Sequence, residues 1–245
     1  MDTNGNPVID VSISYGFGED NRYALDNIPQ KIQLAIYKYD LFMGMKEDIS
    51  KTISKTHTHV KVVHLPLDTL RKNPKDINNL IEFCFNEFGC FKYVIHPNKG
   101  IDHFVYQFMH RWEMQGLILC LETFPYKNKK MIRSPLDIME WCIKYPPVVH
   151  MVIDTSHIEE IWMNYMIMTT LLKYTSVIHL SNQSKDRKIG KHLPINHPDG
   201  IFNLVGFVRD LKYRYKWEGD LVLEYMPDHK NKLIKNRDYI ERLLV

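Results

Sequence analysis

Short apolar runs recur along the whole chain and set its organisation. They are rich in Val, Ile, Leu and Tyr and occupy residues 8–15, 31–37, 60–66, 91–97, 116–123, 148–154, 175–181 and 220–227. Their apolar character is mostly continuous and does not alternate with polar residues. This pattern predicts β-strands that are buried on both faces, as in a parallel sheet.

Helical patterns lie between these runs. In 76–88 one helix face collects Ile77, Leu80, Ile81, Cys84 and Phe88, and Gly89 follows as a stop signal. Residues 102–115 show the same spacing, with Asp102 expected as the N-cap and Gly116 as the stop. Ser134 opens a Ser-Pro-Leu-Asp segment that is typical of a capped helix start.

Alternating strands and helices predict an α/β fold. Eight strands, each followed by a helix, close naturally into a (β/α)₈ TIM barrel, which typically needs about 250 residues. The chain has 245 residues and no Gly/Ser-rich linker, so we expect a single domain over residues 1–245. An open sheet of fewer strands would fit the count nearly as well, and the polar residues at the strand ends favour the barrel.

Six predicted strands carry a possible metal ligand at or near the carboxyl end. These residues are His64, His96, Glu122, Asp154, His179 and Glu224. In a barrel they would converge on the face where active sites of this fold lie. Each alone has an ordinary structural explanation, but a charge at the end of a buried strand is costly unless it is paired or binds metal. Six together favour a Zn²⁺ or Mn²⁺ site.

Composition narrows the class of protein. Hydrophobic residues make up 44% of the chain, enough for a large core, and the net charge of +3 is too small to argue for nucleic acid by itself. The four cysteines lack CxxC spacing and are expected to be buried free thiols. We find no signal peptide and no apolar span long enough for a membrane, and therefore expect a soluble, cytoplasmic protein.

Several segments together resemble the xylose isomerase-like barrel superfamily and, within it, the endonuclease IV branch of apurinic/apyrimidinic endonucleases. They are VSISYGFGEDNRYALDNIPQKIQLAIYK near the start, then VVHLP, VIHPNKG, LCLET, VIDTSH, IHLSNQSK, KHLPIN and LVLEYMP. VIDTSH is similar to the family's Asp-Thr-Cys-His, with Ser156 in place of the cysteine. The resemblance covers nearly the whole chain in pieces, and the order of the motifs carries it.

The resemblance implies a cluster of two or three zinc ions. One would be held by His64, His96 and Glu122, and a second by Glu122, Asp154, His179 and Glu224, with Glu122 bridging. His157 and His192 would hold a third. Two positions depart from the family: Gly190 stands where an aspartate would complete the third site, and Leu67 stands where an aromatic enters DNA. Asp186 is a substitute for that aspartate if its loop is shifted.

Two chemistries fit this scaffold. The first, which we favour from the sequence, is hydrolysis of the DNA backbone at abasic sites, with Glu122 and Glu224 as catalytic residues. Tyr37, Tyr39 and Phe42 would stack on an unpaired nucleotide, and Lys185, Arg187, Lys188 and Lys191 would contact phosphate. Ordinary packing and a solvated charged loop are the competing interpretations of these two segments.

The second chemistry is isomerisation or epimerisation of a small sugar or sugar phosphate by a single divalent metal, Mn²⁺ or Mg²⁺ above all. Glu122 and Glu224 would then exchange protons on opposite faces of the substrate, and His157 and Arg187 would bind its hydroxyls. Gly190 and Leu67 suit this hypothesis, whereas His64 and His96 would be surplus. A third hypothesis, a catalytically inactive barrel that only binds, is disfavoured by the six retained strand-end residues.

Overall fold

The protein is a closed barrel of eight parallel strands. The computed structural model describes residues 7–17, 29–123, 134–186 and 190–245. The strands are β1 (Ile9–Phe17), β2 (Lys31–Ile36), β3 (His59–His64), β4 (Lys92–Ile95), β5 (Ile118–Glu122), β6 (Val149–Asp154), β7 (Thr175–Leu180) and β8 (Gly219–Leu223). They pair in sequence order, and β8 pairs with β1 in parallel. This closure confirms the predicted barrel, and the alternative of an open sheet is wrong.

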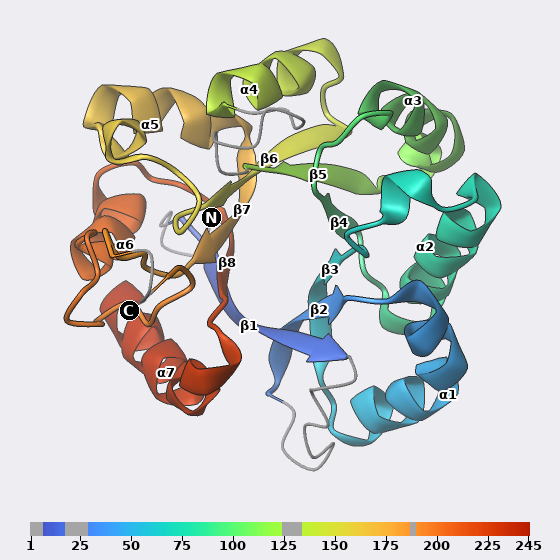
Figure 1. Cartoon of the computed structure of the whole chain (residues 1–245), viewed down its shortest axis with the longest axis horizontal. Helices are drawn as coiled ribbons and strands as arrows, with labels where there is room; N and C mark the ends of the chain where they lie inside the picture. The colour runs from blue at the N-terminus through green and yellow to red at the C-terminus, as the bar shows by residue number, and fades with distance from the viewer. Residues whose placement is uncertain (1–6, 18–28, 124–133, 187–189) are drawn as a thin grey trace.

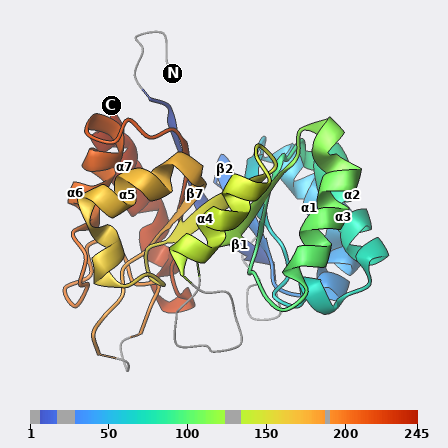
Figure 2. The same ribbon diagram turned by 90° about the horizontal axis from the view of Figure 1, so that it is seen from above.

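Helices surround this barrel as an outer ring (Figure 1). In the described residues they are α1 (Tyr39–Lys55), α2 (Pro74–Phe88), α3 (Ile101–Trp112), α4 (Pro135–Lys144), α5 (Tyr165–Leu171), α6 (Leu204–Tyr213) and α7 (Leu233–Leu244). Figure 2 shows α1 to α3 on one side of the barrel and α5 to α7 on the other, with α4 between them. None of the helices in the described ranges is long and apolar enough to cross a membrane.

Helix ends follow the local sequence signals with one exception. Gly89 ends α2 in the left-handed conformation at φ 61°, and Ser134 forms a complete capping box with Asp137 at the start of α4. The prediction that Asp102 is the N-cap of α3 is wrong, because Gly100 takes that position at φ 98° and Asp102 lies in the first turn. There its negative charge still faces the positive end of the helix dipole.

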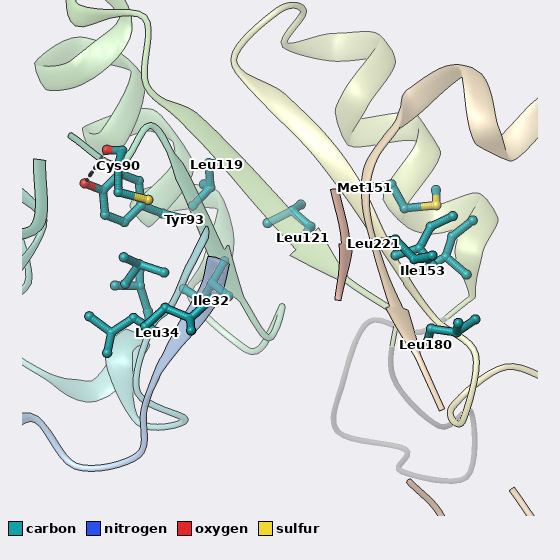
Figure 3. Close-up of a cluster of buried hydrophobic side chains, with 14 of the residues drawn as sticks. Ile32, Leu34, Cys90, Tyr93, Leu119, Leu121, Met151, Ile153, Leu180 and Leu221 are labelled. Atoms are coloured by element: carbon teal, nitrogen blue, oxygen red, sulfur yellow. Dashed lines mark hydrogen bonds between the residues drawn. The ribbon is translucent and has the colours of Figure 1, made fainter. Parts of the chain in front are cut away.

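Side chains that leave the strands outwards form the main core, between sheet and helices. Figure 3 shows part of it, where Leu34, Tyr93, Leu121 and Ile153 come from four different strands. Tyr93 also donates hydrogen bonds from its hydroxyl to the carbonyls of Ile81 and Cys90, which satisfies the one polar atom of a fully buried ring. All four cysteines are free and buried, as predicted.

Side chains that point into the barrel form layers, as this fold requires. The middle layer is almost entirely valine, with Val62, Val94, Cys120, Val152, Val177 and Val222 packed together at 0% exposure. Below it, at the amino ends of the strands, Asp10 pairs with Lys31 and Lys61, and Lys92 pairs with Asp220. Above it lie the polar residues at the carboxyl ends. The barrel axis is therefore closed by ion pairs at one end and packed with apolar side chains in the middle, and its chemistry is confined to the other end.

Candidate metal centre

Glu122 is the centre of the upper layer. Its Oε2 lies 2.9 Å from Nε2 of His64 and 2.9 Å from Nε2 of His96, while its Oε1 lies 3.3 Å from Nδ1 of His179. Glu122 is 1% exposed. Burial would raise the pKa of its carboxyl, but the charges of His96 and His179 outweigh burial and hold the pKa well below its usual range. The group is thus a buried carboxylate that several imidazoles stabilise.

His179 links Glu122 to Glu224. Its Nδ1 also lies 3.0 Å from Oε2 of Glu224, and its Nε2 donates to Oε1 of Gln33 at 2.9 Å. Burial favours a neutral ring, but the two carboxylates dominate and raise the pKa of His179 well above its ordinary value. His179 in turn lowers the pKa of Glu224 to about 2, although burial of Glu224 acts in the opposite direction. Without metal, protons on the imidazoles therefore balance the carboxylates.

Gln33 is the site residue that the sequence analysis missed. It lies fully buried on β2 and, by accepting from Nε2 of His179, leaves Nδ1 directed at Glu122 and Glu224. Fixing the ring nitrogen that does not bind the ion is the usual task of a residue behind a metal-binding histidine. The available signal was an amide inside an otherwise apolar strand, KIQLAI, where an unpartnered polar group would be costly.

A second group of side chains lies around Asp154. Nδ1 of His157 is 3.1 Å from Oδ2 of Asp154, and Nε2 of His157 is 3.1 Å from Nε2 of His192. His192 reaches this position from a loop with a left-handed backbone at φ 53°, a conformation that residues other than glycine adopt mainly at strained, often functional positions. Ser156 and Ser181 each place Oγ 3.3 Å from Nδ1 of His192.

The described residues thus form three groups that could hold metal. In each group the ligand atoms lie within 4.8 Å of one another, and the groups are His64–His96–Glu122, Glu122–Asp154–His179–Glu224 and Asp154–His157–His192. They follow the three sets implied by the family resemblance, except that Asp154 joins His157 and His192. Gly190 offers no side chain, and Asp186 is exposed and belongs to none of the three groups.

The donor set fits a divalent metal. Asp154 is fully buried, and its Oδ1 accepts a hydrogen bond from the backbone of Ser156 at 2.8 Å. Its Oδ2 has Nδ1 of His157 3.1 Å away but accepts no hydrogen bond of good geometry from any described residue. A buried carboxylate oxygen in that state is costly unless a cation compensates it. Imidazole nitrogens and carboxylate oxygens without thiolates are the ligands that suit Zn²⁺ or Mn²⁺.

A small cavity of about 80 Å³ opens onto these groups. Its wall combines the site residues His64, His96, Glu122, His157, His192 and Glu224 with Ala35, Ile36, Tyr37, Leu65 and Leu67 from β2, β3 and the residues that follow them. The lining therefore combines imidazoles and carboxylates with mostly apolar side chains.

Among the predicted DNA-contacting residues that the structure describes, Tyr37 lines this cavity, whereas Tyr39, Phe42, Lys185 and Lys191 do not. Phe42 is 1% exposed and packs edge-on against Phe83 at 6.1 Å between ring centroids, so the expectation that it stacks on a nucleotide is wrong and the packing interpretation holds. Tyr39 begins α1 with Lys72 over its ring at 5.6 Å. Lys185 is exposed, and Arg187 and Lys188 lie outside the described residues.

Comparisons with known proteins support the fold. No family model matches the sequence, and a search of curated proteins finds no similar sequence. Similar solved structures include a D-tagatose 3-epimerase-like protein, at 13% identity and a TM-score of 0.64, covering 96% of this chain and 97% of its own. The probable 3-DHS dehydratase AsbF from Bacillus anthracis is 12% identical with a TM-score of 0.66, covering 96% and 99% of the two chains.

A third similar structure is a xylose isomerase-like TIM-barrel protein from Mycobacterium smegmatis in complex with magnesium. It is 14% identical, has a TM-score of 0.66, and covers 98% of this chain and 97% of its own. These similarities show the TIM-barrel fold, and one of the three structures is described as a xylose isomerase-like barrel. None of the three is described as an endonuclease, so they do not support the endonuclease IV branch in particular.

Proposed function

We propose that this chain is a divalent-metal-dependent isomerase or epimerase of a small sugar or sugar phosphate. The observation that carries the proposal is the group Glu122–Asp154–His179–Glu224, in which two carboxylates contact one buried histidine beside a cavity of about 80 Å³. The fold's similarity to an epimerase-like protein and a xylose isomerase-like barrel supports it.

These four residues would hold one divalent ion. When bound, the ion would supply a Lewis acid that coordinates oxygens of a hydroxyketone and makes the neighbouring C–H more acidic. Asp154 and His179 would serve as ligands only, because neither lines the cavity in which a substrate would lie.

Glu122 and Glu224 would carry the protons. Both line the cavity, and both contact Nδ1 of His179. One group, as a carboxylate, would remove a proton from the carbon next to the carbonyl, and the other, in its carboxylic acid form, would give its proton to the opposite face, which inverts that centre. Exchange of protons with water would then restore the starting forms of both groups. His157, which also lines the cavity, would bind a substrate hydroxyl.

Proton exchange with solvent tests this proposal. Metal-loaded protein would be incubated in D₂O with a panel of ketopentoses, ketohexoses and their phosphates, and deuterium at the carbon next to the carbonyl would be measured by NMR. We expect incorporation with the native chain and a loss of at least about 100-fold for Glu122→Gln and Glu224→Gln. Glu140→Gln, an exposed position on α4, is the matched control. Native protein that exchanges no proton on any sugar would reject the proposal.

A second candidate is phosphodiester hydrolysis at abasic sites in DNA. The specific observation in its favour is that His64 and His96 contact Glu122, and His157 contacts His192, so the residues could hold two or three ions rather than one. A pair of metals would suit in-line displacement at phosphate. Against it, Gly190 removes a third-site ligand and Leu67, not an aromatic residue, lines the cavity. Cleavage of an abasic duplex by the native chain, absent in Glu122→Gln, would favour this candidate.

A further inference from the structure

The cavity has one polar side chain outside the three possible metal-binding groups. Among the described residues that line it, Ala35, Ile36, Leu65 and Leu67 are apolar, and Tyr37 alone adds a hydroxyl. Binding sites of small molecules are mostly apolar, with a few placed polar groups that fix the ligand's orientation. A ligand held by the carboxylates would share this cavity with Tyr37 and the apolar side chains.

Gly16 on β1 sets where the ring of Tyr37 lies. A Cβ placed on Gly16 would be 2.3 Å from Cε2 of Tyr37 and 3.1 Å from its hydroxyl oxygen. The ring therefore rests against the backbone of β1, in space that any other residue at position 16 would fill. Tyr37 keeps 44% of its surface exposed, and the rest of its ring includes this close approach to Gly16.

The hydroxyl of Tyr37 is a hydrogen-bond donor at neutral pH. Burial, with a smaller contribution from the negative charge of Glu224, raises its pKa to about 12. Tyr37 and Glu224 line the same cavity. A protonated phenol in this position can donate to an oxygen of a bound molecule.

We propose that Tyr37 is the substrate-positioning residue of this site, and that it donates a hydrogen bond to a hydroxyl or carbonyl oxygen of a ketose whose carbon face lies against Leu65 and Leu67. Gly16 contributes to this function because, without a side chain, it leaves free the space in which the ring of Tyr37 lies. This inference rests on the proposed function, because it names the part of the cavity that recognises the sugar.

The test uses Tyr37→Phe in the metal-loaded chain, with Tyr106→Phe on the exposed face of α3 as the control. For the ketose that the native protein converts best, we expect Tyr37→Phe to raise KM about 3- to 10-fold, which is the usual range for one lost hydrogen bond, with kcat changed less than about twofold. Tyr106→Phe should leave both constants at the native values. A purely structural role would lower the melting temperature without this split between KM and kcat.

Gly16→Ala provides an independent measurement. The added methyl would meet the end of a side chain that can swing away, so the chain should fold while Tyr37 is displaced. We expect KM to rise in Gly16→Ala as in Tyr37→Phe. In a Tyr37→Ala background the same Gly16→Ala change should have no further effect, because the two residues act as one unit.

The outcomes separate this inference from the proposed function. If the native chain converts a ketose and Tyr37→Phe matches it in KM, the inference about Tyr37 is wrong and the function stands. If the native chain only binds D-fructose in a calorimetric titration, and Tyr37→Phe binds it 3- to 10-fold more weakly, the function is wrong and the inference stands. If the native chain neither converts nor binds a ketose, both are wrong.

Discussion

His64 and His96 contact the same oxygen of Glu122, each with Nε2 2.9 Å from Oε2, and their rings meet edge to face at 4.9 Å. When two imidazoles contact one carboxylate oxygen, the contacts are stabilised in one of two ways. Either the imidazoles carry protons that they donate to the oxygen, or a cation is bound by all three groups. The burial of His64 lowers its affinity for a proton, but the bond and charge of Glu122 prevail and raise its pKa. The one-metal and several-metal hypotheses therefore differ at His64 and His96, which bind an ion only in the several-metal hypothesis.

The metal content should be one divalent ion per chain. His64→Asn should keep that ion, because the group around His179 does not include His64, whereas Asp154→Asn should lose it. Elemental mass spectrometry of protein purified without chelator gives the count. Two or three zinc ions, with one lost in His64→Asn, would move the assignment to the phosphodiesterase.

Gln33→Leu should weaken metal binding by about 10- to 100-fold, the usual effect of losing the residue behind a metal-binding histidine. The reason is that Nε2 of His179 would lose its acceptor, and the ring would no longer present Nδ1 to the carboxylates. Competition with a chromophoric chelator measures the dissociation constant. Gln115→Leu, at an exposed position, is the control, and equal affinities in the two variants would contradict the role of Gln33.

Removing metal should destabilise the fold. Glu122, Asp154 and His179 are buried charged or polar groups that the ion would compensate. With free metal at 100 times its dissociation constant, binding contributes about 2.7 kcal/mol. Since about 2–4 °C accompanies each kcal/mol in a chain of this size, EDTA should lower the melting temperature by roughly 5–10 °C, and added metal should restore it. A melting temperature unchanged by EDTA would argue that the site binds no ion tightly.

The ion pairs at the opposite end of the barrel should make stability depend on acid. Burial opposes ionisation of Asp10, but the hydrogen bonds and charges of Lys31 and Lys61 prevail and lower its pKa below 3.8. A group whose pKa is lowered by folding stabilises the fold above its unfolded pKa, and that contribution is lost as pH falls through the folded value.

Asp10→Asn should therefore cost about 0.5–1 kcal/mol at pH 7, the upper part of the range for partly exposed ion pairs. The difference from the native chain should shrink as pH falls below about 4. Urea unfolding across this pH range measures it, with the exposed Asp48→Asn as control. A difference that stays constant with pH would show that Asp10 does not act through its charge.

The strands and most ligands were predictable because one physical rule links them. Strands buried on both faces must be apolar along their length, so the eight runs stand out, and a His, Asp or Glu at a strand's carboxyl end interrupts that pattern visibly. The order of those strands in a closed barrel then places His64, Glu122 and Glu224 on one face. The sequence correctly predicted Ser134 as the N-cap of α4. It wrongly predicted Asp102 as the N-cap of α3, because Gly100 occupies that position.

The rest depended on contacts that no local pattern encodes. Gln33 reaches His179 across 146 residues because barrel closure brings β2 and β7 to face each other. Phe42 has the same aromatic signal as an exposed stacking residue, and only the packing of α1 on α2 buries it against Phe83. The apolar runs predict the strands, and the residues that interrupt them predict the ligand types, because both follow from burial along single strands. Which ligands meet depends on the stagger of the strands and on loops such as the one that carries His192, and these are set by tertiary contacts.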